Sequence, residues 1–390
     1  MQTASFSTQR VDPYNPPADH VRLQQGGSIT QVPWPNTGTI WVVTKHADVR
    51  TVLGDARFSS DRALPGHPMN SGGYVTGAQL KQLIEMDPPE HAQHRLRIMG
   101  EFTVKKIAAM RPRIEQIVEE TIDAMLASGN EADLVEALSL PVPSMVIADL
   151  LGVPYEDHGF FQENSATFVD ADTPVEGRIA AMGALKKYVG ELVQSRVTAP
   201  GDDILSRQLA AGADPVELTG LGFLLLIAGH ETTANMISLS VAALLDKPEL
   251  LQQLRDDPSL VPGAVEELLR YFTIADVGHQ RLATADIEVA GTMIHAGEAV
   301  YAFANVANRD PDVFPEPNAI DFTRGARNHL AFGFGPHQCL GQNLARLELE
   351  VVLSAVVRRL PTLRLAVPFG EIPFKEFGPN YGVYQLPVAW

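Results

Sequence analysis

The one cysteine of the chain, Cys339, lies in a segment whose composition favours a reactive sulfur. The segment reads FGFGPHQCLGQNLARLELE over 332–350, with glycines at 333, 335 and 341 and a helical pattern directly after the thiol. A sulfur at a helix N-terminus faces unpaired backbone N–H groups and the positive end of the helix dipole, which favours the thiolate. Gly335 and Gly341 would permit a flat ligand to approach closely, or an unusual backbone conformation. A lone cysteine is more often an inert core residue, but this setting favours a functional one.

The longest predicted helix has explicit signals at both ends. Asp214 can cap it, Pro215 suits its first position, and Glu217 can complete a capping box. The apolar pattern continues to about Leu245, just before Lys247-Pro248. At 1.5 Å per residue this helix would be on the order of 45 Å long, so we expect its middle to be buried.

The middle of this helix contains AGHETTAN at 228–235. A buried carboxylate without a partner is costly, so Glu231 suggests a function. The structural alternative is that Thr232 or Thr233 bonds the carbonyl four residues earlier and distorts the helix slightly. The residues alone leave these two interpretations open.

The elements that must position these residues are mainly helical. Strand composition occurs at Thr39–His46 and again between Gly278 and Tyr301, whereas helical spacing dominates from Glu90 to Leu245. The first 37 residues are rich in Pro, Gly and polar groups and are predicted to be irregular, and the tail from Leu363 to Trp390 is predicted to be extended. Without a repeat or a low-complexity linker, the sequence predicts one large domain over 1–390, mainly α with small β-sheets (α+β).

Composition excludes several classes of protein. The 390 residues include 30 Lys and Arg against 47 Asp and Glu, a formal net charge of −17, so the basic surface needed to bind nucleic acid is not expected. The content of 45% hydrophobic and 20% charged residues is typical of a folded chain. One cysteine permits neither an internal disulfide nor a multi-cysteine zinc site. No signal peptide is visible, and the longest apolar run, Leu221–Gly229, is too short to span a bilayer, so we expect a cytoplasmic protein that does not bind membranes.

Four segments together resemble the cytochrome P450 family. In the cysteine segment, the residues that match the haem-binding signature are Phe332, Gly335, His337, Cys339 and Gly341. The other three are Glu267 with Arg270 in VEELLRY, the 228–232 part of the long helix, and His91 with Arg95 in DPPEHAQHRLR. Their order and separations agree with the family over essentially the whole chain. The absence of a membrane anchor resembles the soluble bacterial type.

The resemblance implies haem b (iron protoporphyrin IX) with the Cys339 thiolate as axial iron ligand, a ligand that favours O–O cleavage. Phe332 would pack against the haem or its ligand loop, although ordinary core packing would also explain it. Arginine and histidine side chains would bind the haem propionates, at His91, Arg95, Arg281 and His337. Ala228 and Gly229 would leave room for dioxygen beside the long helix.

The resemblance also assigns a buried structural clamp and an oxygen-activating pair. Glu267 and Arg270 would be joined by Arg324, with Arg327 as the nearest competitor, although a pair three residues apart is usually a weak surface ion pair. Thr232 would hydrogen-bond dioxygen or an ordered water, and Glu231 would relay protons from solvent.

The implied activity is that of a monooxygenase, in which one atom of dioxygen enters an apolar small organic substrate and the other becomes water. The expected setting is secondary metabolism. A peroxide-driven oxidase of the same fold is the first alternative, which Glu231 and Thr232 oppose. A cysteine hydrolase with a Cys339–His337 dyad, and a haem sensor without turnover, are further alternatives.

Electrons must come from outside, because the sequence shows neither a GxGxxG after a strand nor a cysteine cluster. The resemblance implies a small ferredoxin with an NAD(P)H-dependent reductase. Six cations against one acid, Glu101, in Arg95–Arg113 suggest a docking patch on a monomeric enzyme. The cations are Arg95, Arg97, Lys105, Lys106, Arg111 and Arg113.

The substrate pocket is expected to be apolar. Its predicted lining is Phe168, Leu224, Ala228, Ile274 and Val277, with Phe160 and Phe161 close by in the sequence. Asp170, Asp172 and Asp276 could bind a polar end of the substrate, or could be solvated surface residues.

Overall fold

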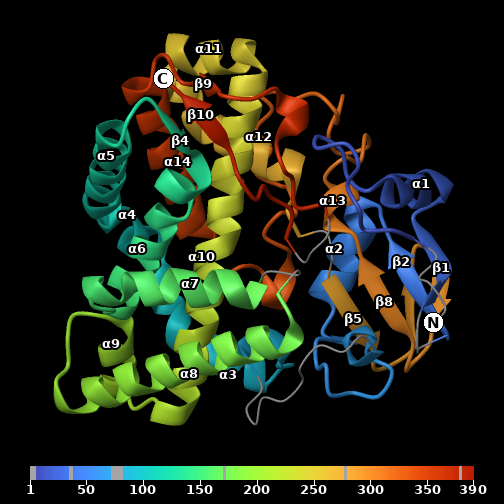
Figure 1. Ribbon diagram of the computed structural model, residues 1–390. Helices are drawn as coiled ribbons and strands as arrows, with labels where there is room; N and C mark the ends of the chain where they lie inside the picture. The colour runs from blue at the N-terminus through green and yellow to red at the C-terminus, as the bar shows by residue number, and fades with distance from the viewer. Residues whose placement is uncertain (1–5, 35–37, 72–81, 170–172, 276–278, 377–379) are drawn as a thin grey trace. The chain divides into compact units, whose positions relative to one another are not determined.

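A computed structural model describes residues 6–34, 38–71, 82–169, 173–275, 279–376 and 380–390 (Figure 1). The chain divides into two compact units. Unit 1 comprises Met1–Leu96, Gly263–Leu340 and Glu376–Tyr381, and unit 2 comprises Arg97–Pro262, Gly341–Lys375 and Gly382–Trp390. The single haem domain over 1–390 stays a prediction.

The helices confirm that the fold is mainly α. They are α1 (Ala18–Gly26), α2 (His46–Gly54), α3 (Glu90–Met99), α4 (Val104–Ala109), α5 (Arg111–Ala127), α6 (Pro141–Leu151), α7 (His158–Val169), α8 (Val175–Thr198), α9 (Ile204–Ala210), α10 (Pro215–Asp246), α11 (Pro248–Asp256), α12 (Val261–Phe272), α13 (Ala304–Ala307) and α14 (Gln342–Arg359). Among the residues described, no helix is both long and apolar enough to cross a membrane.

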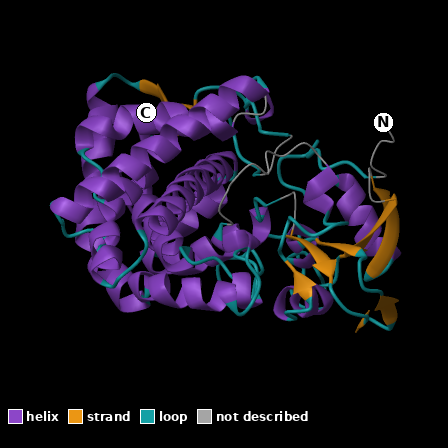
Figure 2. Cartoon of the chain, turned by 90° about the horizontal axis from the view of Figure 1, so that it is seen from below, coloured by secondary structure: helices purple, strands orange, loops and turns teal. Residues whose placement is uncertain are grey.

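The strands are short. They are β1 (Ile29–Trp34), β2 (Gly38–Val43), β3 (Phe58–Ser59), β4 (Glu131–Asp133), β5 (His279–Ala283), β6 (Ile287–Val289), β7 (Thr292–Ile294), β8 (Ala299–Ala302), β9 (Arg364–Leu365) and β10 (Pro387–Ala389). Most of them lie in unit 1, whereas unit 2 is built almost entirely of helices (Figure 2).

The main sheet of unit 1 has the order β1-β2-β8-β5-β3, in which β2 and β8 run parallel and the other neighbours antiparallel. Its central strands are β-branched and aromatic, and the paired Val42 and Tyr301 are fully buried. Strand β5 carries His279 and Arg281, paired with Ala302 and Val300 on β8. Because residues two apart on a strand share a face, His279 and Arg281 point to the same side of the sheet.

Helix α10 of unit 2 begins and ends where its sequence signals predict. The Asp214 side chain accepts the N–H groups of Val216 and Glu217, at 2.9 and 3.1 Å, and Pro215 is the first helical residue. The Glu217 carboxylate, expected to close a capping box, lies 3.3 Å from Arg97 instead. The helix packs against α6, α8 and α14, which buries most of its second half.

The predicted irregular segment 1–37 contains two regular elements, so this prediction is wrong for α1 and β1. Helix α1 has a weak pattern and no side-chain cap, but His20 and Leu23 are buried. The His20 ring stacks on Phe303, with ring centroids 3.9 Å apart, and Val32 of β1 joins the same apolar cluster. Tertiary packing, rather than local propensity, stabilises these elements.

Candidate active site

The loop that carries Cys339 is a turn of 3-10 helix, Gly335–His337, followed by α14 three residues after the cysteine. The Cys339 thiol is exposed, and its backbone N–H donates to the Phe332 carbonyl at 2.8 Å. Phe332 is half-buried, and its ring lies 5.8 Å from that of His329. The sequence therefore places the thiol on an ordered loop, directly before a helix.

The two glycines expected to admit a flat ligand have different surroundings. Gly335 has φ +72°, and a Cβ there would collide with the Leu53 carbonyl of α2. The close approach of α2 and the unusual backbone conformation therefore explain this glycine, without a flat ligand. A Cβ at Gly341 would meet no heavy atom within 4 Å, so this position leaves open space beside the loop.

Four residues of unit 1 that were predicted to bind the propionates converge on one place. The rings of His91 and His337 have centroids 4.1 Å apart, and Arg95 donates to the carbonyl of Gln338, next to the cysteine, at 2.5 Å. Arg281, on β5, is buried and donates to the Gln280 carbonyl at 2.8 Å.

The electrostatics of this cluster favour an anionic ligand. Burial and, after it, the charges of neighbouring cationic groups lower the pKa of His337 to about 3, and burial lowers the pKa of Arg281 to about 10. The Nε2 atoms of His91 and His279 are buried without a hydrogen-bond partner among the described residues. Cations and orphaned nitrogens in one place are the donor set that two haem propionates require, so these residues fit haem.

The Cys339–His337 dyad of a hydrolase does not fit this geometry. With a pKa of about 3, His337 is too weakly basic to take a proton from a thiol near neutral pH. Its ring lies against His91 and among cations, which is the arrangement of an anion site.

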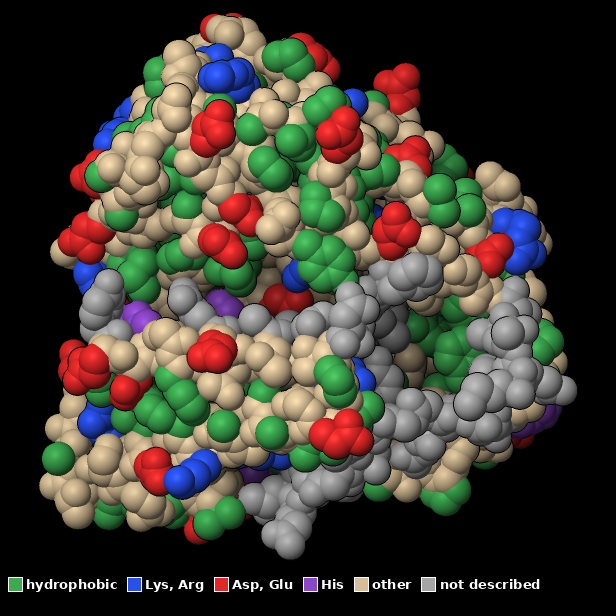
Figure 3. Space-filling model, in the orientation of Figure 1, with side chains coloured by type: hydrophobic (Ala, Val, Ile, Leu, Met, Phe, Trp, Pro, Cys, Tyr) green, Lys and Arg blue, Asp and Glu red, His purple; other side chains and the backbone are tan. Residues whose placement is uncertain are grey.

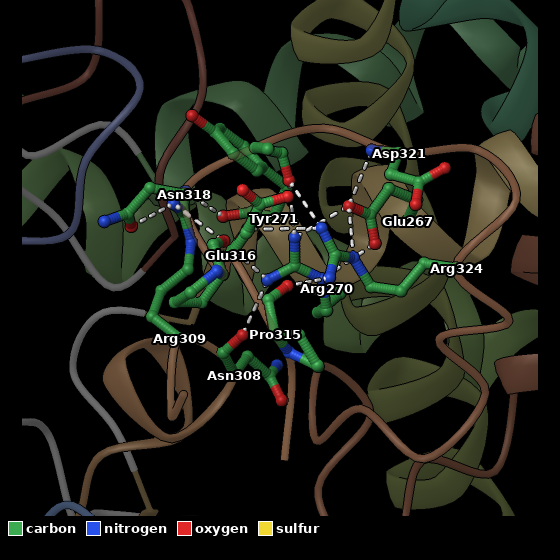
Figure 4. Close-up of polar contacts among 12 residues, drawn as sticks. Glu267, Arg270, Tyr271, Asn308, Arg309, Pro315, Glu316, Asn318, Asp321 and Arg324 are labelled. Atoms are coloured by element: carbon green, nitrogen blue, oxygen red, sulfur yellow. Dashed lines mark hydrogen bonds and ion pairs between the residues drawn. The ribbon is translucent and has the colours of Figure 1, made fainter. Parts of the chain in front are cut away.

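The clamp residues come together as predicted (Figure 4). Arg270 binds Glu267 with two bonds of 2.7 Å, and both side chains are buried. Arg324 reaches the same carboxylate at 3.1 Å, whereas Arg327 is 83% exposed and lies 3.9 Å from Glu266. The remaining donors of Arg270 go to the backbone carbonyls of Asn308, Pro317 and Ala319. The third member is therefore Arg324 rather than Arg327.

The acid–alcohol pair lies on α10 in unit 2. The Thr232 hydroxyl donates to the Ala228 carbonyl at 2.7 Å, which is the structural contact considered for this residue. The helix continues without a break through this point. Gly229, expected to leave room for dioxygen, faces α6 instead: a Cβ there would lie 3.1 Å from Ile147 Cδ1.

Glu231 is not a solitary carboxylate. Its Oε1 lies 3.2 Å from Lys375 Nζ, which is also 3.1 Å from Asn235 Oδ1, one turn further along α10. The side chain of Glu231 is 13% exposed, so the carboxylate is neutralised by a cation but still reaches solvent. Gly382 is required beside this group, because a Cβ there would collide with Asn235.

The predicted substrate residues are only partly described. Phe168, Leu224 and Ala228 belong to unit 2, where the Phe168 ring lies 6.3 Å from that of Phe223. Ile274 belongs to unit 1, and its carbonyl accepts the N–H of Tyr381. Val277, Asp170, Asp172 and Asp276 lie outside the described residues. The pocket stays a prediction.

Four of the six cations of the predicted docking patch have acidic partners, and three of these acids are distant in the sequence. Their ion pairs are Arg97–Glu217, Lys106–Glu101, Arg111–Glu350 and Arg113–Asp149. Lys105 is exposed and forms no ion pair with any residue described. On the face shown in Figure 3, acidic side chains are scattered over the surface with basic side chains among them. The count of one acid against six cations in the sequence therefore does not describe the charge of the folded surface, because distant acids lie beside three of the cations.

Two residues of the site were missed in the sequence. His279 is half-buried, with its Nε2 atom buried, and burial lowers its pKa to about 4. Its spacing of two from Arg281 on a strand was the available signal. Lys375 lies in the extended tail, 144 residues from Glu231, and no local pattern pointed to it.

Comparisons with known proteins identify the family of this chain. The family model described as Cytochrome P450 matches residues 211–379. Vitamin D3 dihydroxylase of Streptomyces griseolus is 49% identical, covering 99% of this chain and 97% of its own. Pentalenic acid synthase of Streptomyces avermitilis is 47% identical, covering 99% of this chain and 97% of its own. The crystal structure of cytochrome P450 MoxA from Nonomuraea recticatena (CYP105) matches with a TM-score of 0.92 and 48% identity, over 99% of this chain and 98% of that one.

The cysteine loop, the buried clamp and these relatives define a haem-thiolate oxygenase. The chain belongs to the cytochrome P450 family. It is a cytochrome P450 monooxygenase that binds haem b through a cysteine thiolate.

Proposed function

We propose that Cys339 is the axial iron ligand and that the residues around it hold the haem of a monooxygenase acting on an apolar small molecule. The observation that carries the proposal is the convergence of His91, Arg95, Arg281 and His337 on the loop of the one cysteine. When bound, thiolate-ligated haem supplies the binding and reductive cleavage of dioxygen.

Two arginines, Arg95 and Arg281, and two histidines, His91 and His337, would bind the two propionates, with His279 as a fifth member. His91 and His279 each have a free Nε2 that can donate to a carboxylate or accept from a water. Arg281 is the strongest candidate for a direct ion pair, because its burial removes competing water and its pKa of about 10 keeps it charged.

On α10, Glu231 would accept a proton from solvent and pass it on, while Thr232 would hold an ordered water. The present bond of Thr232 to the Ala228 carbonyl uses its hydrogen and leaves the oxygen lone pairs free to accept. Lys375 would fix the orientation of the Glu231 carboxylate, because the two groups are 3.2 Å apart.

Electrons would come from a small ferredoxin and an NAD(P)H-dependent reductase. The support for a docking site on α4 is narrower than the sequence suggested: Lys105 is an exposed cation without a described ion pair, beside Val104, whose side chain is 70% exposed. An apolar residue next to a free lysine suits the surface of an acidic partner protein. We propose a cytoplasmic location for this enzyme, acting as a monomer.

The substrate is proposed to be an apolar product of secondary metabolism. The support is the names of two relatives, vitamin D3 dihydroxylase and pentalenic acid synthase, which refer to small organic molecules. Phe168, Leu224, Ala228 and Ile274 are the described residues proposed to contact it.

The coupling of NAD(P)H consumption to product tests the roles of the α10 pair. Thr232→Ala is expected to keep haem and substrate binding but to release reduced oxygen as hydrogen peroxide, so product per NAD(P)H falls. Glu231→Gln is expected to slow turnover by about 10²–10⁴, the usual contribution of one proton-transfer group, because an amide does not relay a proton.

The matched control is Thr233→Ala, which removes the neighbouring buried hydroxyl from the same helix turn. Coupling should be unchanged in this variant. Wild-type coupling in Thr232→Ala would show that this hydroxyl only caps the Ala228 carbonyl, and the proposed role would be withdrawn.

A further inference from the structure

The three residues that lead into the ligand loop of unit 1 are fixed one after another. The Leu330 N–H donates to Asn308 Oδ1 at 2.7 Å, and the Ala331 N–H donates to His329 Nδ1 at 3.1 Å. The next residue, Phe332, presents the carbonyl that accepts the Cys339 N–H at 2.8 Å. The position of that carbonyl therefore depends on where Ala331 is held.

The hydrogen bonds of His329 define its tautomer. Because the backbone N–H of Ala331 donates to Nδ1, that nitrogen carries no hydrogen, and the ring proton is on Nε2. Nε2 lies 3.1 Å from Glu266 Oε2, so it donates to this carboxylate. The His329 side chain is fully buried and that of Glu266 is 7% exposed, so water does not compete for these bonds.

We propose that His329, oriented by Glu266, is a positioning residue for the Cys339 thiolate. By holding the Ala331 N–H it fixes the Phe332 carbonyl, which in turn holds the backbone N–H of Cys339. This inference rests on the proposed role of Cys339 as iron ligand. It concerns neither haem binding by the cations nor the adjacent Glu267–Arg270 clamp.

The hydrogen bond from Leu330 to Asn308 is separate from that of Ala331 to His329. Asn308, which holds Leu330, gives its own carbonyl to Arg270 at 2.8 Å and its amide to the Thr273 hydroxyl at 2.7 Å. Asn308 is thus held by the clamp, and its hydrogen bond to Leu330 persists when His329 is changed. The effect of His329 on the cysteine can thus be measured while the clamp stays intact.

Two replacements of His329 separate its two hydrogen bonds. The amide oxygen of His329→Asn can take the place of Nδ1 and accept from Ala331, whereas the amide nitrogen of His329→Gln can take the place of Nε2 and donate to residue 266. Both variants are made with Glu266→Gln, so that no unpaired carboxylate is buried.

The measurement is the rate at which the haem-loaded, reduced carbon monoxide complex loses its red-shifted, thiolate-specific Soret band on warming. His329→Gln is expected to lose the band roughly fivefold faster than His329→Asn, the factor that corresponds to one hydrogen bond of about 1 kcal/mol. Equal rates in the two variants would show that the ring only fills space, and would overturn the proposal.

A second pair of variants tests the part of Glu266 and does not alter the histidine. Glu266→Gln keeps an acceptor for His329 Nε2 and should retain the wild-type rate. Glu266→Leu removes the acceptor and allows the other tautomer, which cannot accept from Ala331, so the band should be lost faster. Identical rates for these two variants would contradict the inference.

The controls separate this inference from the proposed function. His20→Asn and His20→Gln change another buried histidine, which hydrogen-bonds Asn305 and stacks on Phe303, and both should keep the wild-type rate of band loss. Cys339→Ser should lack the band from the start. If it does so while the two His329 variants behave alike, the positioning role fails and the ligand assignment stands.

Discussion

Removing Arg324 should destabilise the protein far more than removing Arg327, three residues further along the same segment. Arg324 is 10% exposed and donates to Glu267 at 3.1 Å and to the carbonyls of Glu316 and Ala319 at 3.2 and 3.1 Å. Arg327 is 83% exposed, with Glu266 3.9 Å away. Both replacements are made to methionine, which keeps an unbranched chain of similar length.

The expected magnitudes follow from burial. One hydrogen bond to a charged group contributes about 1.5–3 kcal/mol, and carbonyls that lose their donor add to this, so Arg324→Met should lower the free energy of unfolding by roughly 2–4 kcal/mol. The loss stays below that of a fully broken buried pair because Arg270 still holds Glu267 by two bonds of 2.7 Å. An exposed ion pair contributes about 0–1 kcal/mol, so Arg327→Met should have little effect.

The assay is urea unfolding of the haem-loaded protein, followed by far-UV circular dichroism. The Soret band is recorded in parallel, because loss of haem would shift the midpoint by itself. A difference between the two variants of less than about 1 kcal/mol, or a larger loss for Arg327→Met, would refute the assignment of Arg324 to the clamp.

Two further outcomes are expected. Lys105→Glu should slow reduction by ferredoxin at low salt, whereas the control Lys187→Glu, on the exposed side of α8, should not slow it, and substrate affinity should be unchanged in both; equal effects on reduction would place the docking site elsewhere. Burial lowers the pKa of His20 from 6.5 to about 3, so the unfolded chain takes up a proton below pH 6.5 that the folded chain does not. Stability should therefore decline as pH falls below 6.5, by up to about 1.4 kcal/mol per unit, and His20→Phe should reduce that slope in thermal unfolding.

The sequence predicted those parts of the structure whose signals are local. The ends of α10 follow from Asp214, Pro215 and Lys247-Pro248, and the choice of Arg324 over Arg327 agrees with the contacts to Glu267. The convergence of His91 and His337 could be expected only through the family resemblance, because 246 residues separate them and no local rule brings them together.

Contacts between distant segments could not be predicted. Lys375 reaches Glu231 from the tail, and Glu217, Glu350 and Asp149 neutralise cations near α4 and α5 that seemed unpaired in the sequence. Such pairs depend on how helices pack, which leaves no trace in the spacing of neighbouring residues. Helix α1 shows the same limit, since its burial against Phe303 outweighs a weak local pattern.

The most direct test of the central claim is the spectrum of Cys339→Ser in the reduced, carbon monoxide-bound state. Because Cys339 is the one thiol of the chain, its replacement removes every source of a thiolate ligand. The red-shifted Soret band should disappear and hydroxylation should be lost, while haem can still be held by the cations around His91 and Arg281. A variant that kept the red-shifted band would contradict the assignment of Cys339 and the account built on it.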